Sequence, residues 1–425
     1  MPDDGAPAAQ AARRAVEAVW RIESPRLVAS LVALTRDVDL AEDLAQEALV
    51  DALRQWPEQG VPRNPGAWLT AVAKRRAIDG WRRRSALDER YRGMAAQLEE
   101  SAADPFDPID DEMLRLVFLA CHPVLTVEAQ TALTLKLVAG LTSEQLARLF
   151  LVPVATMQQR IVRAKKALTA ARAPFEVPDP SEWTTRLGGV LAVVYLVFTE
   201  GYAPTTGTAT VQRELADEAL RLGRRLAALL PREPEVHGLL ALMELQRSRF
   251  AARTALDGSA ILLEDQDRRR WDAAAIARGR TALARADAAA AARRTARGGY
   301  ALQAAIAEQH AVAPSVAATD WAAIVLLYEV LGRAAPSPIV ELNRAVAVSM
   351  SEGPATALRI VDGLAGDPRL GRSALLPGVR GELLTRLGRV DEARAALLLA
   401  AERAGNERQR AVLLAKASAL DPAGA

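Results

Sequence analysis

The chain has 425 residues, of which half are hydrophobic, and its formal net charge is only +2. This length and composition suffice for about three folded domains, which excludes a chain that is disordered throughout. Since the total charge is close to zero, only the local distribution of charge can indicate a nucleic-acid or other charged partner.

Two further features indicate the compartment. Cys121 is the single cysteine, so no internal disulfide can form, which is typical of a reducing cytoplasm. The residues before Ala11 lack the basic start and apolar middle of a secretory signal. The most apolar run, Val190 to Phe198, is far shorter than the roughly 20 residues that cross a bilayer. We therefore expect a cytoplasmic protein without a membrane segment.

The first part of the chain predicts helices. Apolar residues recur at helical spacing over 11–36, and a break at Ser24 and Pro25 predicts two pieces. Residues 39–56 form a clearer amphipathic helix. Its acids either make a solvated face, favoured near the N-terminus by the helix dipole, or a docking surface for a basic partner. The polar positions are Glu42, Asp43, Gln46, Glu47 and Asp51.

A loop rich in proline and glycine at 57–65 leads into a basic helix at 66–85. Basic side chains beside aromatic rings are typical of single-stranded nucleic acid binding, in which bases stack and phosphates supply affinity. Trp68 and Trp81 lie in this helix, but for those two alone we favour a role as core anchors. Against Asp79 stand six cations, a local net charge of +5: Lys74, Arg75, Arg76, Arg82, Arg83 and Arg84.

Residues 86–112 are acidic, with nine acids against two arginines and a local net charge of −7, which predicts a linker between two basic modules. Helices are expected over 113–122 and 126–139. Cys121 and His122 are adjacent, but a zinc site requires three or four ligands, and the chain offers no second cysteine and two other histidines.

Residues 141–168 predict two short helices joined by a tight turn. Thr142 and Gln145 have the spacing of a capping box, and Pro153 falls where the second helix would begin. The inward face of the second helix is predicted to hold Met157, Ile161, Ala164 and Leu168. Its outward face is predicted to hold Thr156, Gln158, Gln159, Arg160 and Arg163.

This outward face suits DNA. Arginine can bind guanine edges and glutamine adenine edges, while Arg163, Lys165 and Lys166 can neutralise phosphates. Between residues 142 and 172 six cations stand against Glu144, a local net charge of +5 that is typical of a DNA-binding helix pair. The alternative is an ordinary helical hairpin with a solvated basic face.

Beyond a boundary at 174–180 the chain is rich in Ala, Leu and Arg and predicts helices nearly throughout. One internal match pairs Ala357 with Ala393, 36 residues later, close to the tetratricopeptide period of about 34, and favours a helical-repeat solenoid. The segment Glu341–Arg344 and a further polar set either line a ligand groove or anchor neighbouring repeats, the second being slightly favoured. That set is Glu200, Tyr202, Glu264, Asp265, Gln266, Asp267 and Arg268.

Three motifs resemble bacterial RNA polymerase sigma factors of the extracytoplasmic-function group. They are AEDLAQEAL at 41–49, NPGAWLTAVAKRRAIDGWRRR at 64–84 and the helix pair at 141–168. Stretches such as FTEGYAPTTG and LLEDQDRRRW are similar to the subgroup with a tetratricopeptide-like C-terminal extension. The resemblance implies an all-α fold of two small helical sigma domains, the second a helix-turn-helix, followed by a helical-repeat domain. The implied bounds are region 2 at 11–85, the acidic linker at 86–112, region 4 at 113–172 and the extension at 181–425.

The resemblance also implies functional residues. Core polymerase would be bound by Asp43, Gln46 and Glu47. The −10 element and its opened strand would be bound by Arg63, Asn64, Trp68, Lys74, Arg75, Arg76, Arg82 and Arg83. The −35 element would be read in the major groove by Thr156, Gln158, Gln159, Arg160, Arg163 and Lys166.

The implied protein changes which promoters core polymerase recognises, and it has no catalysis and no cofactor of its own. The sequence shows no glycine-rich phosphate loop, nucleophile triad or metal cluster. The extension is expected to regulate the DNA modules in cis or to bind a protein or small-molecule partner. The alternative is a helix-turn-helix regulator with a repeat-type sensor domain, which leaves the first module unexplained. A scaffold of helical repeats would leave both basic clusters unexplained.

Overall fold

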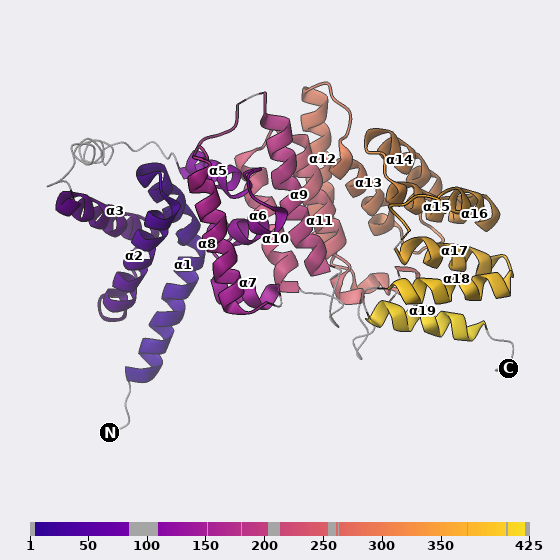
Figure 1. Ribbon diagram of the computed structural model, residues 1–425, viewed down its shortest axis with the longest axis horizontal. Helices are drawn as coiled ribbons and strands as arrows, with labels where there is room; N and C mark the ends of the chain where they lie inside the picture. The colour runs from indigo at the N-terminus through magenta and orange to yellow at the C-terminus, as the bar shows by residue number, and fades with distance from the viewer. Residues whose placement is uncertain are drawn as a thin grey trace. The chain divides into compact units, whose positions relative to one another are not determined.

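The computed structural model describes residues 5–84, 109–150, 152–179, 181–202, 213–253, 261, 263–371, 373–404 and 407–420. Within these ranges every regular element is a helix, which confirms the predicted all-α class (Figure 1). The chain divides into two compact units, residues 1–194 and 195–425, and the boundary falls inside helix α9 (Trp183–Tyr202). None of the described helices is long and apolar enough to cross a membrane.

The first unit begins with three helices that pack on one another: α1 (Gly5–Thr35), α2 (Val38–Gln59) and α3 (Pro65–Arg84). Asp37 caps α2, because its side chain accepts a hydrogen bond from the amide of Leu40 at 3.1 Å. The helix buries one face, as its apolar spacing predicted. The buried residues of α2 are Ala41, Leu44, Ala45, Ala48, Ala52 and Trp56.

The predicted break in the first helix is wrong, because α1 runs through Pro25 without interruption. A proline inside a helix costs about 3 kcal/mol, through the lost hydrogen bond and a steric clash. Val16, Leu27 and Leu31 are almost fully buried on both sides of it. Each such side chain contributes about 1.5–3 kcal/mol on burial, so packing outweighs the local penalty.

Four more helices complete most of the first unit: α5 (Ile109–Ala120), α6 (Val127–Leu137), α7 (Ser143–Leu149) and α8 (Val154–Ala170). The predicted linker ended at residue 112, but residues 109–112 form the first turn of α5. Helix α5 packs against α1. The rest of that linker lies outside the described residues. Thr126 caps α6 by accepting a hydrogen bond from the Ala129 amide.

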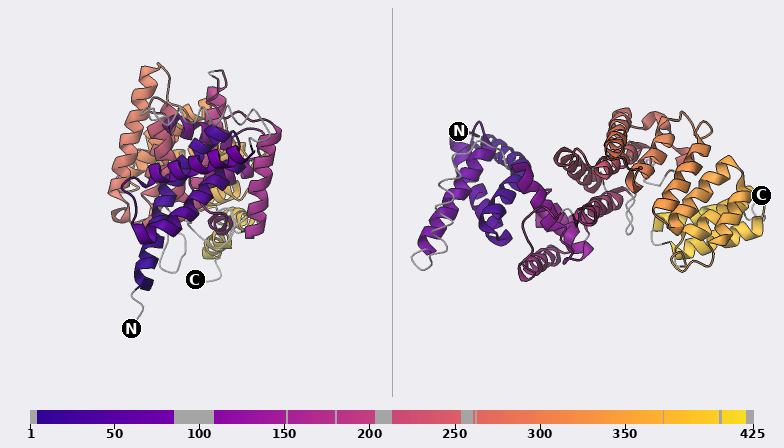
Figure 2. Two further views of the ribbon diagram at one scale, coloured as in Figure 1. Left: turned by 90° about the vertical axis from the view of Figure 1, so that its left-hand side faces the viewer. Right: turned by 90° about the horizontal axis from the view of Figure 1, so that it is seen from above.

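From α10 onward, the second unit is a series of helices in which each packs on the next (Figure 2). Its helices after α9 are α10 (Arg213–Leu229), α11 (Pro234–Arg247), α12 (Ala273–Ala292), α13 (Gly299–Val312), α14 (Trp321–Ala334), α15 (Pro338–Ser351), α16 (Pro354–Gly363), α17 (Leu375–Arg386), α18 (Val390–Arg403) and α19 (Glu407–Ala419). Three short 3₁₀ helices cover Phe250–Ala252, Leu263–Asp265 and Arg268–Arg270.

The internal sequence match corresponds to two successive helix pairs, α16–α17 and α18–α19. Ala357 and Ala393 are both fully buried near the start of the first helix of each pair. A glycine with positive φ precedes each helix, Gly353 at 96° and Gly388 at 73°. Side chains with a Cβ rarely adopt this conformation, so each position favours glycine, although Gly353 is the N-cap of α16 whereas Gly388 lies one residue before the N-cap of α18.

Part of the ambiguous polar set serves as anchors. Arg268 donates to the backbone carbonyls of His310 and, at 2.7 Å, of Ala313, and its guanidinium lies 4.9 Å from the centre of the Trp271 ring. Gln266 is buried and donates to the Ile261 carbonyl. Asp265 and Asp267 are exposed. The side chains of Glu200, Tyr202 and Glu264 lie outside the described residues.

The structure is consistent with both interpretations of the segment Glu341–Arg344, an anchor between repeats and the lining of a ligand groove. Arg344 is held by Glu341 through two contacts of 2.6 and 3.0 Å, as an anchor would be. The same residues line an open pocket of about 590 Å³ beside Tyr328.

Candidate nucleic-acid interface

Helices α7 and α8 pack on each other and form the predicted pair of short helices. The Thr142 amide donates to Gln145 Oε1 at 2.8 Å, and the Gln145 amide donates to Thr142 Oγ1 at 3.2 Å, which confirms the predicted capping box. Pro153 is the N-cap of α8 and not its first helical residue, because its ψ of 145° is still extended. The box and the proline together define where each helix begins.

The two faces of α8 lie as the helical spacing predicted. Met157, Ile161, Ala164 and Leu168 are buried against the rest of the unit. The opposite face is open and has a shallow hollow of about 430 Å³, lined by Ala155, Gln158, Gln159, Val162, Arg163 and Lys166. Of the residues expected to read DNA, Arg160 is half-buried and the exposed ones are Thr156, Gln158, Gln159, Arg163 and Lys166.

Lys165 departs from the sequence-based expectation that it neutralises phosphate. Its side chain is only 12% exposed and pairs with Asp39, at 2.8 Å, and with Glu42 of α2. Burial by itself lowers the pKa of Lys165, but the charge of Glu42 and hydrogen bonds to both acids more than compensate, and the pKa is raised. Lys165 is therefore a charged structural contact between α2 and α8 in this structure.

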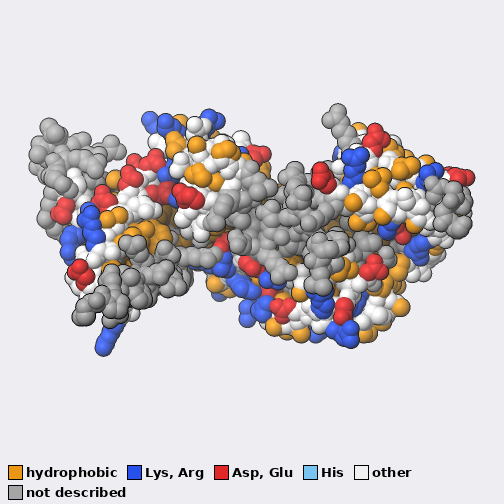
Figure 3. All heavy atoms as spheres, turned by 90° about the horizontal axis from the view of Figure 1, so that it is seen from below, with side chains coloured by type: hydrophobic (Ala, Val, Ile, Leu, Met, Phe, Trp, Pro, Cys, Tyr) orange, Lys and Arg blue, Asp and Glu red, His pale blue; other side chains and the backbone are white. Residues whose placement is uncertain are grey.

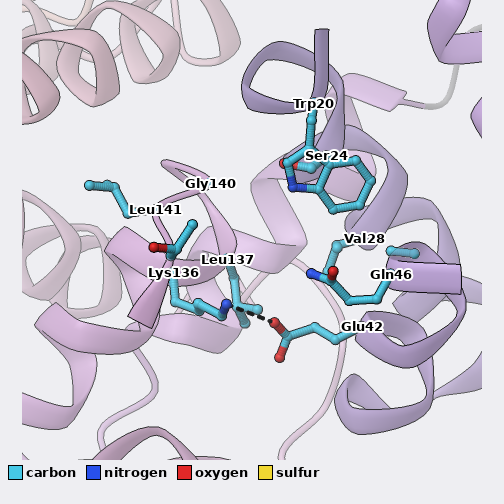
Figure 4. Close-up of a pocket in the computed structure, with 11 residues that line it drawn as sticks. Trp20, Ser24, Val28, Glu42, Gln46, Lys136, Leu137, Gly140 and Leu141 are labelled. Carbon is cyan, nitrogen blue, oxygen red and sulfur yellow. Dashed lines mark ion pairs between the residues drawn. The ribbon is translucent and has the colours of Figure 1, made fainter. Parts of the chain in front are cut away.

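A second lysine makes the same kind of contact. Lys136 of α6 lies 3.8 Å from Glu42, and Figure 4 shows this pair at the edge of a small pocket. Gln46 and Trp20 line the pocket from α2 and α1, and its volume of about 40 Å³ has room for only a few water molecules. Within the first unit, α2 is thus joined to α6 and to α8 by ion pairs.

The three residues of α2 that are expected to bind core polymerase have different surroundings. Asp43, Gln46 and Glu47 are all exposed. Gln46 faces the small pocket, whereas Glu47 pairs with Arg76 of α3 at 2.9 Å. Asp43 has no hydrogen-bond or ion-pair partner among the residues that the structure describes. Of these three residues, Asp43 is therefore the most available to a partner protein.

The basic helix α3 holds side chains in different environments. Arg76 pairs with Asp51 at 2.6 Å as well as with Glu47, and the hydrogen bond to Asp51 is the main reason why the pKa of Arg76 is raised. Arg75 is exposed, while Lys74 is half-buried. For Arg82 and Arg83 only the helical backbone is described.

The start of α3 is formed by residues expected to meet the −10 element. Arg63 and Asn64 are exposed, and Asn64 Oδ1 accepts a hydrogen bond from the Ala67 amide at 3.1 Å, so it caps the helix. Trp68 packs edge-on against the buried Trp56, with ring centres 5.3 Å apart. This contact supports the core-anchor interpretation of Trp68.

Sequence reasoning missed the ion pairs of Lys165, whose partner Asp39 lies 126 residues away. No local pattern marks such a pairing, because Lys165 belongs to an ordinary basic run. Surface charge does not identify the partners of Lys165 either, since acidic and basic side chains are interspersed on the face shown in Figure 3. Only the folded structure, in which Asp39 and Glu42 lie next to Lys165, identifies the partners.

Comparison with known proteins places the two modules in known families. Residues 20–87 match sigma-70 region 2, and residues 115–168 match sigma-70 region 4. Residues 186–287 match a family of unknown function, DUF6596.

Two relatives show how far the similarity extends. An uncharacterized protein of Rhizobium meliloti is 45% identical over 380 residues, which is 88% of each chain. A probable ECF RNA polymerase sigma factor, SigI of Mycobacterium tuberculosis, is 28% identical over 172 residues, 39% of this chain and 58% of that protein. The similarity to the uncharacterized protein therefore extends well beyond the two sigma regions.

Proposed function

Since the chain belongs to the sigma-70 family, in its extracytoplasmic-function group, we propose that it binds core RNA polymerase and selects promoters through their −35 and −10 elements. The observation that carries this proposal is the presence of regions 2 and 4 in one chain. A helix-turn-helix regulator that never opens DNA has no need of region 2. The protein acts in the cytoplasm as a binding subunit, without catalysis or a cofactor of its own.

Region 4 would read duplex DNA through α8. Gln158, Gln159 and Arg163 lie on the open face, and glutamine and arginine are the side chains that bind adenine and guanine edges bidentately. Lys166 would neutralise a phosphate and fix the register of the helix in the major groove. Thr156 and Arg160 complete the proposed reading surface.

Region 2 would bind polymerase and the opened strand. Asp43, Gln46 and Glu47 would dock on the polymerase, with Asp43 as the most accessible contact. Arg63, Asn64, Lys74 and Arg75 would follow the −10 strand, together with Arg82, Arg83 and the exposed part of Trp68, whereas Arg76 is held by Asp51 and Glu47. Phosphate contacts supply most of the affinity for a single strand, and stacking accepts any base.

The C-terminal unit would act as a regulatory extension. We propose that it controls the two sigma regions in cis or binds a protein or small-molecule partner. The polar pocket beside Glu341 and Arg344 is one place where such a ligand could be sought.

Run-off transcription with purified core polymerase on promoter-bearing genomic fragments tests the proposal. The full chain is expected to direct initiation, and Asp43→Lys is expected to reduce it by weakening polymerase binding. Asp391→Lys, on α18 of the second unit, is the matched control and should leave initiation unchanged. If the full chain binds duplex DNA but neither binds core polymerase nor supports initiation, the regulator with a sensor domain becomes the correct function.

A further inference from the structure

The open face of α8 contains an aliphatic side chain among polar ones. Val162 is 47% exposed and lies beside Arg163, four residues after Gln158 and four before Lys166. It lines the hollow of about 430 Å³ together with these residues, Gln159 and Ala155. An apolar patch therefore lies inside the surface that region 4 would turn toward DNA.

Helix geometry places Val162 well away from the buried line. At about 100° per residue, the buried residues Met157, Ile161, Ala164 and Leu168 cluster on one side of the helix. Val162 lies on the opposite half, close to the line of Gln159 and Lys166, and Ala155 lies on nearly the same line two turns earlier. Its side chain thus adds nothing to the core that those four residues form.

Folding gives no local reason for a valine at this position. A β-branched side chain in an exposed helix loses rotamer freedom and is less favourable there than alanine. Val162 also has no covering element among the residues that the structure describes, since it remains almost half exposed. A surface that binds something apolar would account for it.

The major groove offers one apolar group at the edge of its bases. Guanine, cytosine and adenine present hydrogen-bond donors and acceptors there, whereas thymine presents its C5 methyl group beside one acceptor. Glutamine, arginine and lysine around Val162 can satisfy the polar groups and phosphates. The two Val162 methyl groups have a partner of matching chemistry only where thymine occupies the groove.

We propose that Val162 packs against the C5 methyl group of a thymine in the −35 element and so selects a T·A pair at that position. This inference rests on the proposed function, because it requires α8 to lie in the major groove of promoter DNA. It adds a base preference that the hydrogen-bonding side chains do not supply.

Replacing thymine by deoxyuridine tests the contact, because the change removes the methyl group and leaves base pairing intact. Duplexes with a randomised −35 segment are first selected for binding to core polymerase carrying the full chain. In the selected duplex each thymine is then replaced in turn by deoxyuridine. With the unmodified chain, replacement of one thymine is expected to weaken binding about fourfold. This is the ratio of dissociation constants that corresponds to the free energy of burying one methyl-sized group.

Val162→Ala supplies the decisive comparison. This variant should bind the thymine duplex more weakly than the unmodified chain and should show no further loss with deoxyuridine at the same position. Because alanine favours an exposed helix, loss of folding does not complicate the measurement. Val127→Ala, on the exposed first residue of α6, is the control and should retain the fourfold response.

The outcomes separate the two proposals. If a −35 sequence is selected but no deoxyuridine replacement weakens binding, the thymine contact is wrong while the proposed function stands. The same conclusion follows if Val162→Ala responds to deoxyuridine as strongly as the unmodified chain does. If no sequence is selected at all, the proposed function fails and the inference fails with it.

Discussion

At the scale of single residues, Cys121 shows how burial suppresses thiol chemistry. Its Sγ lies 3.3 Å from Thr134 Oγ1, and burial raises the pKa of Cys121 to about 11. Only the thiolate is reactive, so the folded chain at pH 8 should react with an aromatic disulfide reagent at least about a hundredfold more slowly than the chain in urea, whose thiol pKa is about 8.5. Release of the coloured thiol measures both rates. Equal rates would contradict the claim that burial raises the pKa of Cys121.

Two neighbouring arginines on α3 should respond differently to truncation. Arg76 is held by Asp51 and Glu47, so Arg76→Ala is expected to lower the free energy of unfolding by up to about 1 kcal/mol. Arg75 is exposed, so Arg75→Ala should leave stability unchanged and reduce the salt dependence of opened-strand binding by about one counterion. Urea titration and binding to a fork-shaped DNA at several salt concentrations check the pair. Identical profiles for the two variants would argue against different roles.

At the scale of elements, the contact between α2 and α8 limits how many cations α8 offers to DNA. Lys165 is held by Asp39 and Glu42, so the double variant Asp39→Asn, Glu42→Gln should free it for a phosphate. We expect tighter binding of duplex DNA and a plot of log K against log salt that is steeper by about one.

The control for this experiment removes the same charge from the same helix. Asp43 and Glu58 are exposed acids of α2 that do not pair with Lys165, so Asp43→Asn, Glu58→Gln has the same net charge. It should leave the salt slope for duplex DNA unchanged. An equal change in both double variants would mean that total charge, and not the release of Lys165, determines the effect.

The packing of α11 on α13 depends on a glycine. A Cβ on Gly238 would lie 2.7 Å from the backbone nitrogen of Ala301, and backbone cannot move aside cheaply. Gly238→Ala is therefore expected to destabilise the second unit by about 1–3 kcal/mol. Gly363→Ala in α16 is the matched control, because a Cβ there meets no atom within 4 Å. Thermal unfolding compares the two, and a Gly238→Ala midpoint as high as that of the control would exclude the predicted clash.

The elements differ in how far sequence could predict them. The faces of α8 and the capping box at Thr142 and Gln145 depend on spacings within a turn or two, and the structure confirms both. The break expected at Pro25 was wrong because packing of α1 against other helices outweighs a local preference. The burial of Lys165 depends on a partner 126 residues away, which no local pattern contains.

At the scale of the whole molecule, the boundary between units does not follow the proline-rich segment at 174–180. The first unit extends into α9, where Trp183 packs on Phe118 with ring centres 5.3 Å apart and Arg186 donates to the Phe118 carbonyl at 3.1 Å. A fragment ending at Arg172 should therefore be less stable than one ending at Val194, by about 1–3 kcal/mol. Thermal unfolding of both fragments tests this, and equal midpoints would show that α9 adds nothing to the first unit.

The contact between α5 and α9 also affects the order in which the first unit folds during synthesis. Phe118 emerges from the ribosome before its aromatic partner Trp183, which is added 65 residues later. Domains generally fold in order as the chain grows, but here the part that contains both sigma regions remains without the contact of Phe118 with Trp183 until the start of α9 has been translated. The timing of its maturation is thus encoded in a segment that lies outside both regions that would contact DNA.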